Sequence, residues 1–432
     1  MFGQQPSPQA RNLPEELQAR NPDVRAKLAA ARSDSEAGKY DEAFGEDRQA
    51  LEIAKQVGFS GDIALAEDAL ASAEFISGRV QAGWDLDRDA LQKAVESSNF
   101  VLQADILTSL SSYSQSAGNV KGAMSLLAQA LDAAEKSKNL YIKSRVLGEM
   151  GRLQLLVGEK EQSKNSLDEA LRIDSINSYP FRSLHLVYQA YFLLSDDHTV
   201  QDGIQELEKA RDVAVSDRNY LALVLAETAL GASYVHTGDP ERGIGVLQSM
   251  NSGDMKLDNG PQGTETEFRA VLRLPYIRAS SLEALGNAYE AAKRTSDAIA
   301  AWSQLYSFSG RGMTQANAEA AQHLGKLYAA QGDNENAAKY FQIAAVQWQT
   351  SGNNALLIQS LAGEAVSLAK TGQSDKAISA ENELAQTAIR LNARRAEFLA
   401  YLGMAEIYQS ATPKMSLTPT EFISYLANAE TG

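Results

Sequence analysis

Glycine and small apolar residues recur along this chain with a period of 40 residues. The period is clearest in the glycines that follow helix-like patterns of apolar positions, and such self-similarity is typical of repeat architectures. After one interruption the register resumes. The positions that share it are Gly38, Gly78, Gly118, Gly158, His198, Gly238, Lys293, Gly332, Gly372 and Thr412. This spacing predicts nine helical repeats and a partial tenth.

Further columns of small residues follow the same register. Five residues after the turn position stand Ala43, Gly83, Ala123, Ser163, Gly203, Gly243, Ala298, Ala337 and Ala377. Seven residues before it stand Ala31, Ala71, Ser111, Gly151, Tyr191, Gly231, Gly286, Gly325 and Ala365, of which all but Tyr191 are small. Small side chains allow two helix axes to approach to about 8–10 Å. Each repeat is therefore predicted to be a tight antiparallel helical hairpin, and the fold to be all-α.

Residues at the expected helix ends agree with this interpretation. The second helix of a repeat should stop near "SSNF" (97–100), "SKNL" (137–140), "DRNY" (217–220) or "SGNN" (351–354), where Asn can adopt the left-handed conformation. Pro180 and Pro275 share one column and suit the first turn of a helix. "TPTE" (418–421) predicts a capping box that opens a last short helix, from Pro419 to about Ala429.

These columns resemble the tetratricopeptide repeat (TPR). The stretches "LEALGNAYEAAKRTSDAIAAW" (282–302) and "AQHLGKLYAAQGDNENAAKYF" (321–341) match its pattern best. Repeats one to five lack the Tyr of the first helix, and the period is 40 residues rather than the usual 34. The longer period resembles arrays of bacterial regulators, of arms attached to caspase-like peptidases and of kinesin light chain. The resemblance implies a right-handed superhelical solenoid with first helices on its concave side.

The chain divides into five segments by these patterns. We expect a disordered N-terminal arm (1–20), repeats 1–6 (21–250), an irregular insertion loop (251–267), repeats 7–9 with the first helix of a partial tenth (268–411), and a C-terminal cap (412–432). Gly, Asn, Asp and Pro cluster in the insertion, which is a turn signal. It is interpreted either as surface filler or as a lid or binding loop.

Composition narrows the possible functions. The formal net charge is −15, which opposes general attraction to nucleic acid or to anionic membranes. The chain has no cysteine, so it holds no disulfide, thiolate zinc site or cysteine nucleophile. No apolar run reaches the roughly 20 residues that span a bilayer, so we expect a soluble protein without membrane insertion. The N-terminal residues suit both a disordered arm and an exported chain after signal removal, which leaves cytoplasmic and periplasmic locations open.

Catalytic and cofactor motifs do not emerge from the sequence. The four histidines, His185, His198, His236 and His323, lie far apart without metal-ligand spacing, and the phosphate-binding glycine motifs and the G-x-S-x-G elbow do not occur. Lysine and arginine neither cluster nor alternate with aromatics, and the Arg394–Arg395 pair is interpreted as pairing with carboxylates. We therefore expect a non-enzymatic protein that binds no cofactor, metal or nucleic acid.

The resemblance places a peptide-binding groove on the concave surface, at first-helix positions thirteen, ten, nine and six before the turn. These positions hold Arg145, Arg152, His185, Tyr188, Gln189, Phe192, Asn287, Gln322 and Lys326, with Arg25, Arg32 and His323 in the same columns. Two arginines beside aromatic rings suit an acidic or C-terminal peptide. The other interpretation, salt bridges between neighbouring repeats and ordinary packing aromatics, stays open at this point. A two-carboxylate clamp for chaperone tails is not supported, because only Asn287 fits it.

The leading hypothesis is a protein–protein interaction scaffold that binds a peptide or partner protein in this groove. The alternative, of another class, is the recognition or sensor arm of a larger signalling or peptidase protein whose effector domain lies outside this chain. Fold-level analogy is an associational argument for either hypothesis.

The predicted register can be tested at Ala130, in the alanine column twelve residues after the turn. Ala130→Phe should overpack the hairpin and lower the free energy of unfolding by about 1–3 kcal/mol. Thermal melting followed by circular dichroism measures the change. A melting curve identical to that of the wild type would show that the register is wrong.

Overall fold

The computed structural model describes residues 13–36, 39–252, 268–269, 271–272, 274–309 and 314–411. Within these ranges the regular secondary structure is entirely helical. The chain divides into two compact units, unit 1 (Met1–Ala284) and unit 2 (Leu285–Gly432). This boundary lies inside helix α14 (Pro275–Ala291), whereas the sequence pattern placed the division at 251–267. The predicted all-α array of hairpins is confirmed in each unit, while its right-handed sense stays a prediction.

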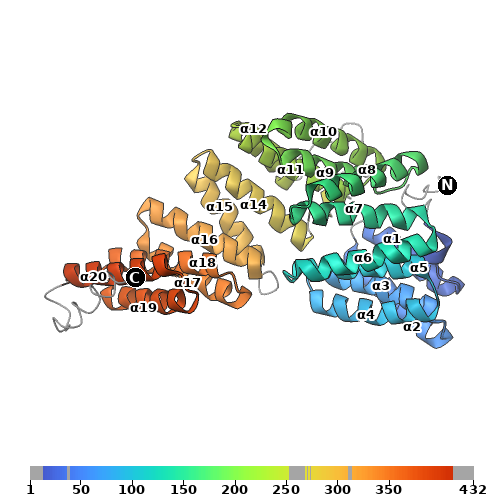
Figure 1. Cartoon of the computed structure of the whole chain (residues 1–432), viewed down its shortest axis with the longest axis horizontal. Helices are drawn as coiled ribbons and strands as arrows, with labels where there is room; N and C mark the ends of the chain where they lie inside the picture. The colour runs from blue at the N-terminus through green and yellow to red at the C-terminus, as the bar shows by residue number, and fades with distance from the viewer. Residues whose placement is uncertain are drawn as a thin grey trace. The chain divides into compact units, whose positions relative to one another are not determined.

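Unit 1 is a series of antiparallel helical hairpins (Figure 1). First helices pack on second helices within each hairpin, and α3, α5, α7 and α9 also contact one another in succession. The first helices therefore form one layer. The helices α1 to α12 of unit 1 are α1 (Pro22–Glu36), α2 (Tyr40–Val57), α3 (Ser60–Ile76), α4 (Val80–Glu96), α5 (Phe100–Ser116), α6 (Val120–Ser137), α7 (Leu140–Leu156), α8 (Lys160–Asn177), α9 (Arg182–Leu194), α10 (Val200–Asp217), α11 (Tyr220–His236) and α12 (Pro240–Ser252). The odd-numbered ones are first helices and the even-numbered ones second helices.

Unit 2 repeats this arrangement. It contains the end of α14 and the helices α15 (Thr295–Ser309), α16 (Thr314–Gln331), α17 (Asn334–Ser351), α18 (Asn354–Lys370), α19 (Ser374–Arg390) and α20 (Arg394–Ala411). The first helices α16, α18 and α20 contact one another, as in unit 1. Helix α20 occupies the position expected for the first helix of the partial tenth repeat.

The two columns of small residues lie where the helices of each hairpin approach. A Cβ atom added to Gly83 would lie 2.8 Å from the Ala71 carbonyl oxygen, so this contact leaves no space for a larger residue. In other hairpins a serine occupies the contact and stabilises it, because Ser163 Oγ donates to the Gly151 carbonyl at 2.7 Å. Glycines seven before the turn also make room for large side chains of the second helix, as Gly286 does for Trp302. The close helix approach inferred from the sequence is confirmed.

The turns between helices correct one expectation. The asparagines of "SSNF", "SKNL" and "DRNY" do not end helices in the left-handed conformation. Asn99, Asn139 and Asn219 have negative φ, and each side chain accepts a backbone N–H in the first turn of the next helix. The residues just before them adopt positive φ: Ser98, Lys138 and Arg218. Asparagine is favoured at the N-cap position because its short side chain reaches the unpaired backbone N–H groups of the first helical turn.

Among the described residues, left-handed positions thus recur about every 20 residues, and both turns of repeats two, three, four, eight and nine have one. One set follows the first helix and includes Gly78, Gly118, Gly158, Gly238, Lys293, Gly332 and Gly372; the other follows the second helix and includes Gly58, Ser98, Lys138, Ser178, Arg218, Gly352 and Asn392. His198 departs from this pattern, because it lies in the 3₁₀ helix η3 (Asp197–Thr199). Pro180 lies in the turn before α9, whereas Pro275 opens α14 as expected.

The N-terminal arm is ordered where the structure describes it, contrary to the expected disorder of 1–20. Residues 13–20 include the 3₁₀ helix η2 (Glu15–Leu17), and Leu17 and Ala19 are buried. Asp62 at the start of α3 accepts the backbone N–H groups of Arg20 and Asn21 at 2.7 and 2.8 Å. Apolar burial together with these hydrogen bonds offsets the entropy of ordering the segment. The insertion (253–267) and the cap (412–432) lie outside the described residues.

The left-handed turns generate a stability prediction. Gly158 has φ +84° and open space around it, so a methyl group would meet no neighbour and only the backbone conformation would be strained. Gly158→Ala should lower the free energy of unfolding by about 1 kcal/mol. The matched control is Gly45, which lies in the interior of α2 with equally open surroundings. Gly45→Ala should stabilise the protein by about 0.5–1 kcal/mol. Equal effects of the two substitutions in urea unfolding would contradict the turn assignment.

Candidate functional site

The first helices α5, α7 and α9 of unit 1 bring together most of the predicted groove residues. Arg145 and Arg152 lie on α7, and His185, Tyr188, Gln189 and Phe192 lie on α9. We call Asp105, Arg145, Glu149, Arg152 and Tyr188 the first-helix network, because all of them belong to this layer. Their positions in the register place them on the surface that was expected to bind a partner.

Arg145 pairs within the chain. Its guanidinium forms an ion pair with Asp105 of α5, and the Arg145 side chain is 32% exposed. Asp68 of α3 and Asp87 of α4 lie close enough for Arg145 to lower their pKa. Burial outweighs this effect and raises the pKa of both carboxyls, and the negative charge of Asp68 raises that of Asp87 further. Arg145 therefore partly offsets the acidic cluster of Asp68, Asp87 and Asp105, which spans two hairpins.

Arg152 is held by three groups from three helices. Its Nε donates to Glu149 at 2.9 Å, and its Nη2 donates to Gln115 of α5 at 2.7 Å. Tyr188 of α9 donates its hydroxyl to the same Glu149 at 2.7 Å, and its ring centroid lies 5.7 Å from the guanidinium carbon. Burial would raise the pKa of Glu149, but Arg152 and the Tyr188 hydroxyl lower it below its usual range. Glu149 is thus an ionised partner that links α7 to α9.

His185 is a core residue that is almost entirely shielded from solvent. Its side chain is 2% exposed, and Nδ1 lies 2.7 Å from Asp174 Oδ2. A side chain at Gly148 would overlap the His185 ring, which fills that space. Ser144 donates to the other oxygen of Asp174 and not to the histidine, so the three residues lack the nucleophile–base geometry of a hydrolytic triad. The groove assignment of His185 is therefore wrong.

The predicted site residues of unit 2 divide into buried and exposed ones. Gln322 is 2% exposed, and its Oε1 accepts hydrogen bonds from Trp348 Nε1 and Ser360 Oγ, so it serves the core. Asn287 and Lys326 are exposed, as a binding surface requires. His323 stacks on Trp302 at 4.1 Å, and both rings bond to Glu290. The assignment of Gln322 to a groove is corrected for the same reason as that of His185.

Sequence reasoning missed the acidic members of the network. Asp105 and Glu149 occupy the same first-helix columns, thirteen and nine residues before the turn, as the residues that were singled out. A search of these columns for opposite charges in neighbouring repeats would have found them. The structure favours the interpretation of a salt bridge between neighbouring repeats for Arg145. Arg152 instead pairs with Glu149 on its own helix and contacts the neighbouring repeats through Gln115 and the Tyr188 ring.

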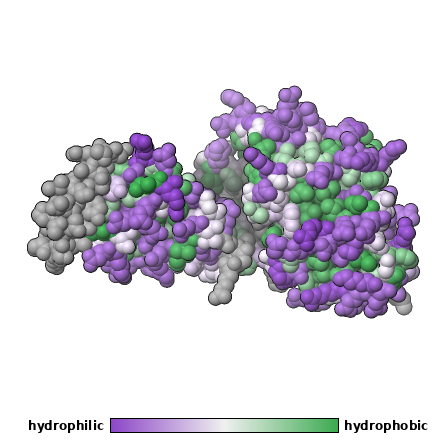
Figure 2. Space-filling model, turned by 60° about the horizontal axis from the view of Figure 1, so that its bottom comes forward, coloured by the Kyte–Doolittle hydropathy of each residue, from purple (hydrophilic) through white to green (hydrophobic). Residues whose placement is uncertain are grey.

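A pocket of about 970 Å³ lies at the edge where the first helices begin. The N-terminal segment forms one wall with Glu15, Glu16 and Gln18, and Phe59 and Phe100 contribute apolar side chains. Phe59, Phe100 and Leu140, the residues that precede or open α3, α5 and α7, are 51%, 39% and 46% exposed. Apolar residues also appear among hydrophilic ones on the surface of the larger unit in Figure 2. We call this edge, with Phe59, Asp62, Asn99, Phe100 and Leu140, the first-helix edge.

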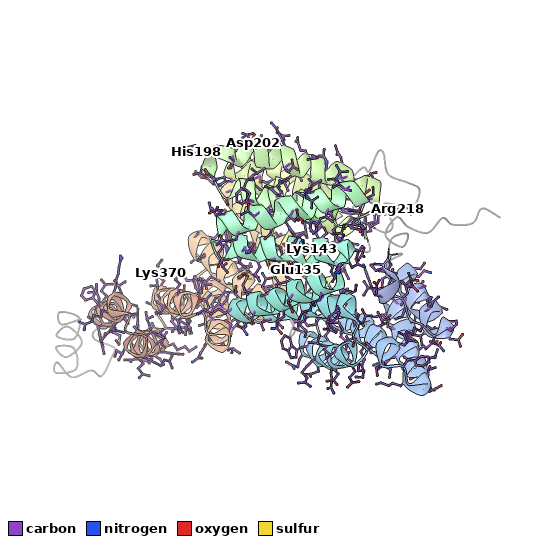
Figure 3. The ribbon with its side chains drawn as sticks, turned by 45° about the vertical axis from the view of Figure 1, so that its right-hand side comes forward. Glu135, Lys143, His198, Asp202, Arg218 and Lys370 are labelled. Carbon is purple, nitrogen blue, oxygen red and sulfur yellow. The ribbon has the colours of Figure 1, made fainter. Side chains whose placement is uncertain are left out.

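Charges of both signs are distributed over the remaining surface. Glu135 near the end of α6 and Lys143 near the start of α7 are labelled in Figure 3, as are Asp202 and Arg218 at opposite ends of the α10 region. Across the described residues, no group of three His, Asp or Glu side chains could hold a metal ion. None of the described helices combines the length and the apolar character needed to cross a membrane.

Comparisons with known proteins found solved structures of low sequence identity. No family model matches the sequence, and no curated protein matches it. A STAND signal-transduction ATPase with a tetratricopeptide repeat sensor from Pyrococcus horikoshii is 12% identical, with a TM-score of 0.46 over 91% of this chain and 52% of that chain. A Rap protein complexed with competence and sporulation factor is 12% identical, with a TM-score of 0.47 over 90% of this chain and 98% of that chain.

This chain spans about half the length of the STAND protein. The hypothesis of a recognition arm belonging to a larger protein stays a prediction. The architecture of the described residues, successive antiparallel hairpins with first helices in one layer, is that of a TPR-like helical repeat protein.

The first-helix network generates a prediction about stability. Arg152→Met removes the charge that holds the half-buried Glu149. It should lower the free energy of unfolding at pH 8 by about 1–3 kcal/mol, less than for a fully buried pair, because both side chains are partly exposed. Arg172→Met is the control, since Arg172 pairs with Glu169 on the surface and should leave stability unchanged. Urea unfolding measures both. Wild-type stability of Arg152→Met would show that the network is not structural.

Proposed function

We propose that this chain is a non-enzymatic interaction scaffold that binds an extended segment of a partner protein along the first-helix layer of unit 1. The observation that carries the proposal is the chain's own N-terminal segment. It crosses the starts of α3 and α5. Side chains at these helix starts form hydrogen bonds with both its backbone N–H groups and a backbone carbonyl. Asp62 accepts two backbone N–H groups, and Asn99 Nδ2 donates to the Glu16 carbonyl at 2.6 Å.

Contacts of this kind are independent of side-chain identity, and a partner segment in extended conformation offers the same groups. The adjoining pocket of about 970 Å³ has space for further residues, and Phe59 and Phe100 supply apolar contact at its wall. Exposed apolar side chains that adjoin polar groups are a common feature of interaction sites. The first-helix edge is therefore the part of unit 1 where we place the entry of the partner segment.

The expected preference for an acidic or C-terminal peptide loses support. Arg145 and Arg152 each already pair with a carboxylate of the chain, and a ligand carboxylate would have to displace Asp105 or Glu149. Gln189 and Phe192 remain partly exposed on α9 and are retained as contact residues. Asn287 and Lys326, which are exposed in unit 2, stay a separate prediction. We propose recognition by backbone and apolar groups rather than by charge.

Site-specific photocrosslinking tests this proposal. A benzophenone amino acid replaces Phe100 at the edge or Phe192 on α9, and the control position is Ala128, an exposed residue of the second helix α6. In cells that express the protein, a common partner should crosslink at positions 100 and 192 and not at 128. Equal capture at all three positions, or capture at 128 alone, would contradict the proposal.

A further inference from the structure

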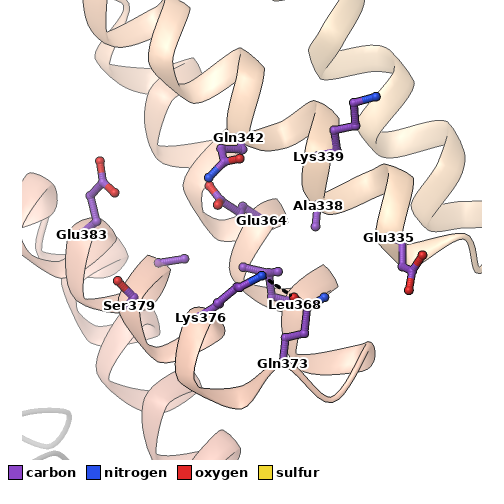
Figure 4. A pocket seen from close by; sticks show the side chains of 11 residues that line it. Glu335, Ala338, Lys339, Gln342, Glu364, Leu368, Gln373, Lys376, Ser379 and Glu383 are labelled. Atoms are coloured by element: carbon purple, nitrogen blue, oxygen red, sulfur yellow. Dashed lines mark hydrogen bonds between the residues drawn. The ribbon is translucent and has the colours of Figure 1, made fainter.

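Unit 2 contains a pocket of about 440 Å³ between α17, α18 and α19 (Figure 4). Ala338, Leu368 and Ala380 contribute apolar groups to it, and Gln342 and Gln373 contribute amides. The second helices α17 and α19 form its walls, and none of its lining residues belongs to the first-helix network. Its unusual member is Glu364, which comes from the first helix α18 between these walls.

Glu364 occupies an apolar column of the repeat. It lies eight residues before Gly372, and the equivalent positions of other repeats hold Leu70, Leu110, Met150, Leu230, Leu285 and Leu324. Like these residues Glu364 is buried, with only 9% of its surface exposed. Figure 4 shows its carboxylate in the middle of the lining, beside the Gln342 side chain, with no hydrogen bond to the other residues drawn.

The charges around this carboxylate do not compensate it. Burial raises the pKa of Glu364 to about 7, and the negative charge of Glu383 on α19 acts in the same direction. Lys376, which lies on α19 like Glu383, donates to Gln373 Oε1 at 2.8 Å and not to Glu364. Glu335 and Lys339 of α17 complete the charged lining. A carboxylate that replaces a core leucine without a partner is costly, and a bound cation with N–H donors would remove that cost.

We propose that this pocket binds the guanidinium or ammonium group of a basic side chain carried by a partner polypeptide. An anion would meet the Glu364 carboxylate, and a purely apolar group would leave it without a hydrogen bond. A cation satisfies it and places its alkyl chain against Leu368 and Ala380. This pocket belongs to unit 2 and the surface assigned to the partner segment belongs to unit 1, so the two proposals can be tested separately.

Calorimetric titration with N-acetyl-argininamide and N-acetyl-lysinamide tests this site in the full chain. At pH 8 at least one of the two amides should bind, whereas the neutral N-acetyl-norleucinamide should not. Glu364→Gln and Glu364→Leu should each weaken binding at least tenfold, and the leucine variant should melt at a higher temperature because it restores the column residue. Its higher melting temperature would also show that the loss of binding does not come from unfolding.

Glu381→Gln is the matched control. Glu381 is a carboxyl of α19 with 5% exposure, but it does not line the pocket, so its substitution should leave binding unchanged. Binding to the wild type should weaken about tenfold from pH 8 to pH 6, because protonation of a carboxyl with a pKa of about 7 removes the anion that the cation needs. Unchanged affinity in Glu364→Gln, equal binding of the norleucine amide, or no binding of either basic amide at about 50 mM would overturn the proposal.

Discussion

The close approach of the two helices within each hairpin is the constraint on which the rest of this structure depends. All nine small residues of the column five after the turn are buried. Gly83 and Gly243 directly face the backbone of the first helix of their own repeat. A Cβ atom at Gly243 would lie 2.5 Å from the Gly231 carbonyl oxygen, which shows how little space the contact leaves. Because the approach is set in each hairpin, neighbouring hairpins can stack with a common spacing, and stability becomes a sum of local and nearest-neighbour contacts.

Polar side chains at buried columns of the repeat show where packing contributes less to the stability of the array. Nine residues after the turn, most repeats place a large apolar residue such as Leu167 or Trp302, but the first two and the last place Asp47, Asp87 and Glu381. Burial raises the pKa of Asp47 to about 7 and that of Glu381 to about 8. These carboxyls bind protons more tightly in the folded chain than in the unfolded one. Their contribution to stability is therefore complete below about pH 4 and is lost as the pH rises through 7 to 8.

The candidate site could be predicted from the sequence only in part. The columns correctly placed Arg145, Arg152 and Tyr188 on one layer, but they could not tell a side chain that faces solvent from one that bonds to the next repeat. His185 and Gln322 were misassigned because a partner on another helix, Asp174 or Trp348, draws each into the core. The contacts between helices join residues from 11 positions apart, as His185 and Asp174 are, to 39 positions apart, as Tyr188 and Glu149 are. A register alone does not specify which side chains meet there.

By itself, the sequence determined the repeat period, the all-α class and the hairpin contacts. Local rules suffice for these features, because small residues permit close packing and the turn glycines suit positive φ. Only the tertiary structure decided the rest. It assigned the left-handed conformation to Ser98 and Lys138 and the capping role to Asn99 and Asn139, it ordered residues 13–20 against Asp62, and it enclosed Glu364 in a pocket. Each of these outcomes depends on which groups compete for the same hydrogen bond or the same volume, and that competition exists only in the folded chain.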